Sequence, residues 1–296
     1  MSYTLTILTS TYNRAHALPQ LYQSLLKQAD KRFEWVVVDD GSTDETEQLI
    51  DQFTQESQLT IKYLKQENKG KHVALNTGIK EIESELTFIV DSDDYLTQDA
   101  TDIILKKWQT VEKNNLCGIS FLKGYTEEKV IGSPYPEKEM IANFINLRAN
   151  QGVSGDKAEI WKTSLLKKYP FPQFEGEKFI GEAYVWYQIA KSYDMLFVNQ
   201  IIYVAEYLTD GLTKSGRLLR IKCPLGGMAH SEMAMSTEFR MKVRVKNTWL
   251  FVCYGLFAKK NFSTIFRITE HKSLVFFNFL FGYMLYHYWK LKYKVR

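Results

Sequence analysis

The segment Val90-Asp91-Ser92-Asp93-Asp94 places three carboxylates within four residues, directly after the mostly apolar run 86–90. A second acidic segment, Val38-Asp39-Asp40-Gly41-Ser42-Thr43-Asp44, follows the apolar run 35–38 in the same way. Short, β-branched and nearly unbroken apolar runs are typical of parallel strands that are covered on both faces. We therefore expect both acidic segments at the carboxyl edge of one parallel sheet, where open α/β sheets bind their ligands.

Helical patterns separate these strands. The apolar residues between Leu18 and Leu26 fall on one face of a helix, and Pro19 is tolerated in its first turn. A second helix is expected after Asp44, and a third from about residue 71 to residue 83. This alternation of strands and helices predicts right-handed crossovers and an α/β fold, with a mostly parallel central sheet flanked by helices.

Asp93 and Asp94 are candidate metal ligands. Carboxylates this close repel one another unless a cation or water separates them, and carboxylate oxygens suit Mg²⁺ or Mn²⁺. Such ions usually keep several coordination positions for substrate phosphates and water. The alternative is a solvated acidic turn that caps a helix starting near Gln98.

Asp40 is a candidate for recognition of a nucleotide base. A base with an imide N–H, such as uracil, needs an acceptor opposite that hydrogen, and an ionised carboxylate is an acceptor only. The alternative is a local turn in which the side chain of Asp40 bonds the backbone of the Asp-Gly-Ser segment. Ser10 and Tyr12, after the first strand, are candidates to flank the same base by hydrogen bonding and stacking, or are packed without such a role.

Four segments together resemble the successive motifs of family 2 glycosyltransferases with the GT-A fold, a Rossmann-like architecture. They are Thr11-Tyr12-Asn13, 38–44, 68–76 and 91–94, and weaker similarity continues to about residue 216. The resemblance implies a nucleotide-sugar donor, uridine-linked in the interpretation we favour, and inversion at the anomeric carbon. Enzymes of this type assemble bacterial surface polysaccharides.

The resemblance also implies roles for individual residues. Asp40 would bind the base, Ser10 and Tyr12 would border it, and Asp91 and Asp93 would form the ends of an Asp-x-Asp motif. Whether Asp93 or Asp94 touches the metal stays open. The nucleotide-binding residues expected in this way are Ser10, Tyr12, Asp40, Lys71, Asp91 and Ser92.

Glu182 is the candidate catalytic base, since an acceptor hydroxyl must lose its proton during transfer. It lies where an aromatic amphipathic helix is expected to begin, and the dipole of a helix start favours an ionised carboxylate. Many relatives carry a Glu-Asp pair here with the second acid as base, whereas this chain has Ala183, which leaves Glu182, with Glu177 in reserve. The alternative is that Glu182 only caps the helix.

Cations near the diphosphate would compensate the charge of the leaving group. Lys69, Lys71, Lys214 and Arg217 are the candidates. Lys214 and Arg217 lie in the segment 209–217, whose glycines and hydroxyls suit either a mobile loop that closes over the donor or a plain linker. His72 and His230 are weaker candidates as metal ligands, because a lone histidine is usually packed or exposed.

The chain changes character after residue 216. Residues 217–296 contain 15 Lys and Arg against 3 Asp and Glu, net +12, whereas residues 1–216 contain 23 against 31, net −8. Two apolar, aromatic stretches, 248–258 and 273–289, lie in the basic part. Basic flanks around such stretches are typical of helices that lie on an anionic membrane. The alternatives are a helical cap on the catalytic domain or an oligomer contact.

We therefore expect a GT-A catalytic domain over 1–216, with a nucleotide-sugar half to about residue 115 and an acceptor half from 116, followed by a basic helical region over 217–296. Its acceptor would be a glycan or lipid-linked sugar at the membrane, and a homo-oligomer is possible. Nucleic-acid binding is disfavoured because it leaves the apolar runs unexplained. Three scattered cysteines and no secretory signal favour the cytoplasm, at the inner face of the membrane. The alternatives are transfer to a polyprenyl phosphate, or a non-catalytic binding module.

Overall fold

The computed structural model describes residues 3–112, 115–205 and 212–295, with the backbone alone for 212–215. The chain divides into two compact units. Unit 1 comprises residues 1–143, 153–170 and 192–208, and unit 2 comprises residues 144–152, 171–191 and 209–296. The expected boundary at residue 216 instead falls inside a helix, and parts of the expected acceptor half belong to unit 2.

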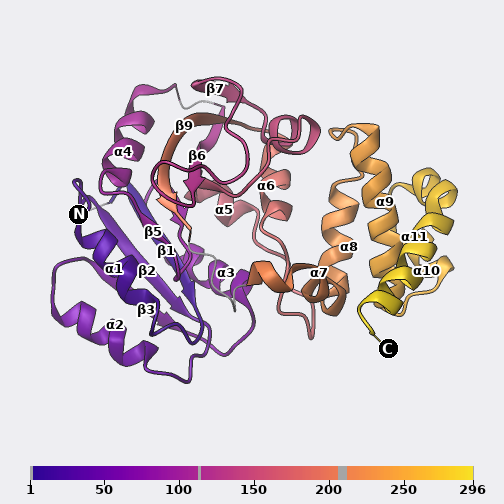
Figure 1. Cartoon of the computed structure of the whole chain (residues 1–296), viewed down its shortest axis with the longest axis horizontal. Coiled ribbons are helices and arrows are strands. Elements are labelled where there is room, and N and C mark those ends of the chain that lie inside the picture. The colour runs from indigo at the N-terminus through magenta and orange to yellow at the C-terminus, as the bar shows by residue number, and fades with distance from the viewer. Residues whose placement is uncertain (1–2, 113–114, 206–211, 296) are drawn as a thin grey trace. The chain divides into compact units, whose positions relative to one another are not determined.

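Within the described residues, nine strands form one sheet in unit 1 (Figure 1). The strands β3, β2, β1 and β4 are parallel neighbours, while β8 runs antiparallel between β4 and β6, and β9 is parallel to β6. The short strands β5 and β7 both pair antiparallel with β9. The α/β fold is therefore confirmed, but the parallel order holds for the nucleotide-binding half and gives way to a mixed sheet beyond β4. The strands are β1 (Leu5–Thr11), β2 (Phe33–Asp39), β3 (Ile61–Lys65), β4 (Leu86–Ile89), β5 (Tyr95–Leu96), β6 (Leu116–Gly124), β7 (Glu139–Ala142), β8 (Lys157–Lys162) and β9 (Asp194–Val204).

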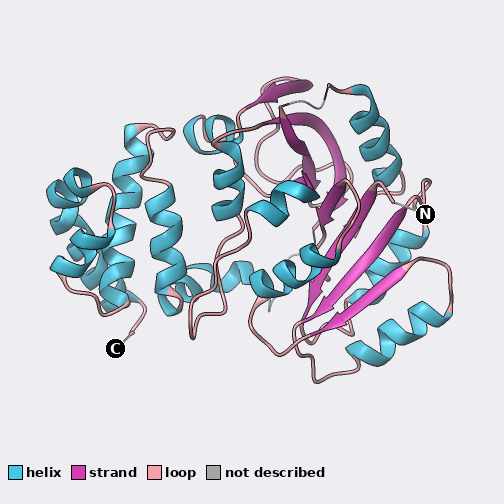
Figure 2. Cartoon of the chain, turned by 180° about the vertical axis from the view of Figure 1, so that it is seen from behind, coloured by secondary structure: helices cyan, strands magenta, loops and turns pink. Residues whose placement is uncertain are grey.

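Helices cover both faces of the parallel strands, as Figure 2 shows for the cyan helices around the magenta sheet. On one face, the β2 residues Trp35 and Val37 belong to a buried cluster with Leu21 and Phe53 from α1 and α2. On the other face, Gly78 of α3 approaches Leu8 so closely that a Cβ there would lie 2.4 Å from its side chain. Two-sided burial explains the unbroken apolar sequence of these strands. The helices of unit 1 are α1 (Leu18–Leu26), α2 (Thr46–Gln55), α3 (Lys71–Glu81), α4 (Ala100–Thr110) and α5 (Thr163–Lys168).

The regular secondary structure of unit 2 is helical in its described residues. Its elements are the π-helix η1 (Ile145–Asn150), α6 (Ala183–Ala190), α7 (Leu212–Lys222), α8 (Pro224–Met233), α9 (Met241–Phe257), α10 (Phe262–Ile268) and α11 (Lys272–Lys292). Its core contains Phe251, Val252 and Tyr254 of α9 with Val275 and Trp289 of α11. The first apolar stretch, 248–258, therefore lies in a helix that fills this core, so the expectation that it lies on a membrane is wrong.

The two longest helices of unit 2 meet at a glycine. A Cβ at Gly282 of α11 would lie 2.5 Å from the Val252 Cβ of α9 and 2.9 Å from the Trp249 carbonyl oxygen. No helix in the part of the chain that the structure describes is long and apolar enough to cross a membrane.

Replacing Gly282 with alanine should destabilise unit 2, although alanine normally favours a helix over glycine by about 1 kcal/mol. The added methyl group meets the Val252 side chain and the Trp249 carbonyl oxygen, and overpacking of this kind costs about 1–3 kcal/mol. Gly216→Ala in α7 is the matched control, because nothing lies within 4 Å of its Cβ position. Thermal unfolding followed by circular dichroism should show a lower midpoint for Gly282→Ala and an equal or higher one for Gly216→Ala. A Gly282→Ala midpoint as high as that of Gly216→Ala would contradict the close packing of α9 and α11.

Candidate active site

Asp40 fastens the end of β2 to the loop that precedes α3. Its Oδ1 accepts hydrogen bonds from Gln66 Nε2 (2.7 Å) and the Lys69 backbone N (2.9 Å), and its Oδ2 accepts one from the Gly70 backbone N (2.8 Å). Gly70 has φ 96°, in the left-handed region that favours glycine. Because a carboxylate has about four acceptor positions, these bonds leave capacity for a further donor such as an imide N–H.

The alternative of a local turn at Asp40 does not hold, because the preceding residue forms that turn. Asp39 accepts the Ser42 backbone N–H at 2.7 Å through Oδ1 and the Tyr63 hydroxyl at 2.7 Å through Oδ2. Burial, followed by the hydrogen bond to Asp39, raises the pKa of Tyr63. Asp39 therefore shapes the turn, and Asp40 is left to face the loop at 66–70.

Ser10 and Tyr12 lie at the end of β1, beside the end of β2. Thr11 pairs with Asp39 in the parallel register, and the Asp40 backbone N donates to the Thr11 carbonyl at 2.8 Å. Ser10 is half-buried, whereas 48% of Tyr12 is exposed. The Tyr12 ring is therefore accessible to a planar ligand, and the base-binding roles of Ser10 and Tyr12 stay predictions.

Asp91, directly after β4, is held by two lysines. Lys71 Nζ, in the first turn of α3, lies 2.5 Å from Asp91 Oδ1, and Lys123 Nζ, on β6, lies 3.9 Å from Oδ2. Burial alone would raise the pKa of Asp91, but the two ammonium groups outweigh it and lower the pKa to about 2. Asp91 therefore stays ionised at neutral pH, and the expected contact of Lys71 with the diphosphate stays a prediction.

Asp93 and Asp94 differ in accessibility. Asp94 is 5% exposed, and its Oδ2 accepts a hydrogen bond of 2.6 Å from the Tyr203 hydroxyl of β9, which in turn accepts the Asp91 backbone N–H at 2.9 Å. Asp93 is less buried, and burial, together with the charge of Asp91, raises its pKa. A carboxylate whose charge is disfavoured in this way gains from a nearby cation, so Asp93 suits a metal better than Asp94.

The residues fit a divalent cation that is shared with a ligand. No group of three or more His, Cys, Asp and Glu side chains that could hold a metal occurs among the described residues. Mg²⁺ is commonly bound through one or two carboxylates together with substrate phosphates and water, rather than in a cage of protein ligands. Ser92 is 6% exposed, and its expected contact with a nucleotide stays a prediction.

Glu182 precedes α6 at the N-cap position, as the sequence predicted for the helix start. Its side chain makes no capping hydrogen bond, which disfavours a purely capping role. Glu177 does have such a role, since its carboxylate accepts the backbone N–H groups of Leu225 (2.7 Å) and Gly226 (2.8 Å) at the start of α8. Glu182 belongs to unit 2, and its role as base stays a prediction.

The expected mobile loop over 209–217 is a helix where the structure describes it. Residues 206–211 and the side chain of Lys214 lie outside the described residues, so the role of Lys214 stays a prediction. Arg217 lies in α7 with its guanidinium 5.0 Å from the ring centre of Trp289, within unit 2. Lys69 is exposed, and its Nζ lies 3.8 Å from Glu67 Oε2.

Neither histidine lies in a group of metal ligands among the described residues. His72 is 3% exposed beside Asp40, and burial lowers its pKa against the opposing charge of that carboxylate. Burial also lowers the pKa of His230 to about 4, with help from the positive charges of Arg220 and Lys246. The positive charges of Arg220 and Lys246 disfavour a metal at His230, but a neutral imidazole remains available for hydrogen bonding.

A family model named "Glycosyl transferase family 2" matches residues 6–160, more than half of the chain. The chain belongs to glycosyltransferase family 2. The matched region contains both acidic segments, the Asp40 loop and α3. The resemblance seen in the sequence motifs is thereby confirmed.

Comparison with known proteins gives relatives of the same family. The glycosyltransferase GlyA of Streptococcus pneumoniae is 29% identical over 224 residues, which cover 74% of this chain but only 30% of GlyA. The crystal structure of Staphylococcus aureus TarS 1–349 in complex with UDP-GlcNAc matches with a TM-score of 0.62 at 19% identity, covering 99% of this chain and 92% of the other. The mannosyltransferase PcManGT of Pyrobaculum calidifontis, in complex with GDP-Man and Mn²⁺, gives 0.60 at 17% identity and covers 100% and 89%. At these identities the structural matches show the GT-A fold.

The sequence did not predict roles in this site for Gln66, Lys123 and Tyr203. Gln66 binds Asp40, while Lys123 and Tyr203 support Asp91 and Asp94. Gly70 lies in the segment 68–76 that carries the family resemblance, but its hydrogen bond to Asp40 was not predicted. Lys123 and Tyr203 lie in strands far along the chain, and no local pattern connects them with the acidic segment.

Proposed function

We propose that this glycosyltransferase uses a UDP-sugar and a divalent metal to glycosylate a hydroxyl group of a membrane-held glycan or lipid-linked acceptor, with inversion at the anomeric carbon. The observation that carries the proposal is the placement of the Asp40 loop and the Asp91–Asp93 segment at the ends of β2 and β4, on either side of β1. Two strand spacings separate these ends by about 10 Å. A ligand with a base at one end and phosphates at the other suits such a site.

The choice of donor follows from the chemistry of Asp40 and is supported by the complex of TarS with UDP-GlcNAc. The carboxylate of Asp40 accepts hydrogen bonds and lies 4% exposed at the end of β2, as recognition of an imide N–H requires. The exposed Tyr12 ring offers a stacking surface beside it. Lys71 and Lys123 add positive charge near the acidic segment.

The proposed reaction is a single displacement. The acceptor hydroxyl gives its proton to the Glu182 carboxylate, a bond forms between the acceptor oxygen and the anomeric carbon, and the bond from that carbon to the diphosphate oxygen breaks. Asp93 would help to hold a divalent cation, which would neutralise charge on the departing nucleoside diphosphate. Lys71 keeps Asp91 ionised, and the Tyr203 hydroxyl holds Asp94 in place.

The helix α11 carries the apolar surface that we propose to contact a membrane. This helix buries Val275, Gly282 and Trp289 in the core of unit 2 and exposes large apolar side chains on its other face. The exposed apolar residues are Phe276, Phe277, Leu280, Phe281, Tyr283, Met284, Tyr288 and Leu291. Lysines flank this face at both ends, at Lys272, Lys290 and Lys292. We propose that it lies on an anionic lipid surface at the inner face of the cell membrane.

Donor hydrolysis across UDP-GlcNAc, UDP-glucose, UDP-galactose and GDP-mannose, with Mn²⁺ or with a chelator, tests the donor and the metal. We expect Mn²⁺-dependent release of UDP from one uridine donor, and a loss on the order of a hundredfold or more in Asp93→Asn. Asp51→Asn, an exposed change in α2, is the control and should keep its activity. Binding of a sugar nucleotide without turnover would favour a binding module instead.

Glu182→Gln tests the base. Removal of a positioned general base typically lowers kcat by about a hundredfold to ten-thousandfold, so transfer should fall by this factor while the affinity for UDP is kept. Glu175→Gln, an exposed neighbour in the sequence, serves as control. If Glu182→Gln retains nearly full kcat, the acceptor is an anion such as a polyprenyl phosphate, which needs no base.

Flotation with vesicles tests the α11 surface. The wild type should bind vesicles that contain phosphatidylglycerol more strongly than neutral phosphatidylcholine vesicles, and less at high salt. Phe277→Ser with Leu280→Ser should weaken binding about tenfold or more, because each side chain contributes up to about 1.5–3 kcal/mol when buried. Ile141→Ser, an exposed apolar residue of unit 1, is the control. Equal binding of all three proteins would refute the membrane role of α11.

A further inference from the structure

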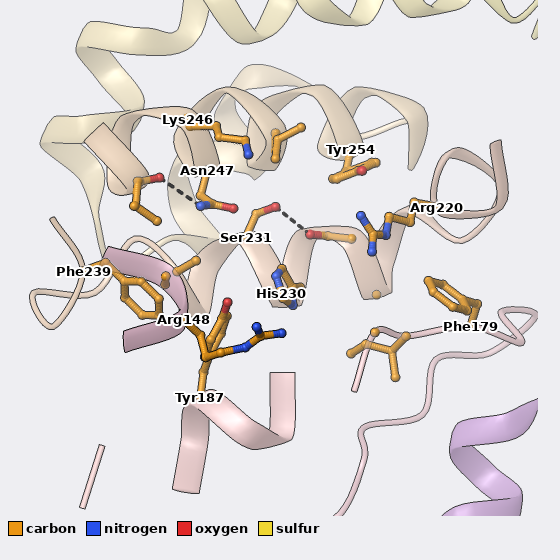
Figure 3. Close-up of a pocket in the computed structure, with 18 residues that line it drawn as sticks. Arg148, Phe179, Tyr187, Arg220, His230, Ser231, Phe239, Lys246, Asn247 and Tyr254 are labelled. Carbon is orange, nitrogen blue, oxygen red and sulfur yellow. Dashed lines mark hydrogen bonds between the residues drawn. The ribbon is translucent and has the colours of Figure 1, made fainter. Parts of the chain in front are cut away.

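A cavity of about 330 Å³ is lined wholly by residues of unit 2 (Figure 3). Its wall combines η1, the segment 179–181, α6, α7, α8 and α9. This volume is at the lower end of the range for small-molecule sites, about 300–1,000 Å³. It exceeds what a single water molecule needs and suits a compact ligand.

The lining of this cavity is basic. Arg148 from η1, Arg220 from α7 and Lys246 from α9 contribute to it, and no carboxylate occurs among the lining residues that the structure describes. Figure 3 shows Arg148 and Arg220 directed towards His230 from different sides. Three cations gathered from three separate elements create a positive potential inside a partly enclosed space, which favours an anionic ligand.

His230 supplies a second observation. Its Nδ1 is buried and has no hydrogen-bond partner in the described structure. Buried polar atoms in folded proteins are nearly always paired, so this nitrogen marks a polar group in the cavity wall that the packing of unit 2 leaves unsatisfied. Burial, helped by the charges of Arg220 and Lys246, lowers the pKa of His230 and keeps the imidazole neutral at pH 7, so one ring nitrogen can donate a hydrogen bond to an anion.

The wall is fixed by close packing rather than by exposed loops. A Cβ at Gly226 would lie 2.7 Å from the Phe179 carbonyl oxygen, and one at Gly227 would lie 2.7 Å from the Tyr254 ring. These two glycines let α8 approach α9 and the segment 179–181. Arg148 sits in a π-helix, a form that is rare and frequent at functional sites.

The cavity lining includes a residue next in sequence to Glu182, the proposed base. Gly181 lines the cavity, Glu182 is the next residue, and Tyr187 of α6, five residues after Glu182, lines it as well. From these observations we infer that the cavity binds a phosphate group carried by the acceptor, as a monoester or a diester. This inference rests on the proposed function, because it assigns the acceptor's anionic group to the unit that carries Glu182.

The experiment compares two double variants of the full chain. Arg220→Gln with Lys246→Gln removes two cations of the cavity, and Lys222→Gln with Lys242→Gln removes the same charge from exposed positions on the same two helices outside the lining. All four positions are exposed, so both proteins should fold, which far-UV circular dichroism checks. The probes are glycerol 3-phosphate, glycerophosphoglycerol, inorganic phosphate and uncharged glycerol, measured by calorimetry.

We expect the wild type to bind the phosphate esters and not glycerol, and the cavity variant to bind them about tenfold or more weakly, with less than a twofold change in the control variant. The His230 imidazole NMR signal should shift on binding. Tighter binding of the esters than of inorganic phosphate identifies an acceptor site, whereas binding only to phosphatidylglycerol vesicles would overturn it in favour of a lipid headgroup site. Equal weakening in both variants, or a loss of UDP affinity in the cavity variant, would also overturn it.

The two proposals fail separately. Donor hydrolysis without any binding of phosphate esters refutes the acceptor site and leaves the glycosyltransferase function standing. Binding of the esters by a protein that turns over no donor refutes the proposed function and leaves an anion site in unit 2.

Discussion

The hydrogen bonds of the Asp40 carboxylate fix the geometry of the loop between β3 and α3, on which the proposed nucleotide-sugar site depends. The carboxylate binds the side chain of Gln66 and the backbone N–H groups of Lys69 and Gly70, and so fixes the loop that leads into α3. Hydrogen bonds to a charged group contribute about 1.5–3 kcal/mol each, and leaving such a carboxylate buried without them would be costly. Because α3 begins at Lys71, the same loop sets the position from which Lys71 reaches Asp91. A residue at the end of β2 thus influences the acidic segment at the end of β4.

The three carboxylates after β4 have separate environments. Asp91 is paired with Lys71 and Lys123, and Asp94 accepts a hydrogen bond from the buried Tyr203 hydroxyl. Burial and the negative charge of Asp91 both raise the pKa of Asp93. Repulsion among the three is therefore relieved for two of them by the protein itself. A nearby cation would therefore stabilise the ionised form of Asp93 most, which favours Asp93 over Asp94 as the metal ligand.

The apolar and the basic residues of 217–296 each divide between two places in unit 2. The apolar residues of α9 form a core with α11, while the outward face of α11 stays exposed. The basic residues likewise divide, since Arg220 and Lys246 line a cavity and Lys290 and Lys292 flank the exposed face. A single basic and aromatic region thereby offers two different surfaces, one suited to a small anion and the other to a lipid layer.

The sequence by itself determined the strands β1, β2 and β4, the helix starts at Lys71 and after Glu182, and the family. These features follow from local rules, because two-sided burial dictates unbroken apolar strands and the carboxyl ends of parallel strands gather at one edge. Only the tertiary structure decided that Asp39 rather than Asp40 forms the turn, that Glu177 caps α8, and that Tyr203 and Lys123 support the acidic segment. It also decided that α9 is a core helix and that unit 2 begins within the expected catalytic domain. Side chains far apart in the chain meet only through packing, and hydrophobic composition does not distinguish a helix buried in protein from one that faces lipid.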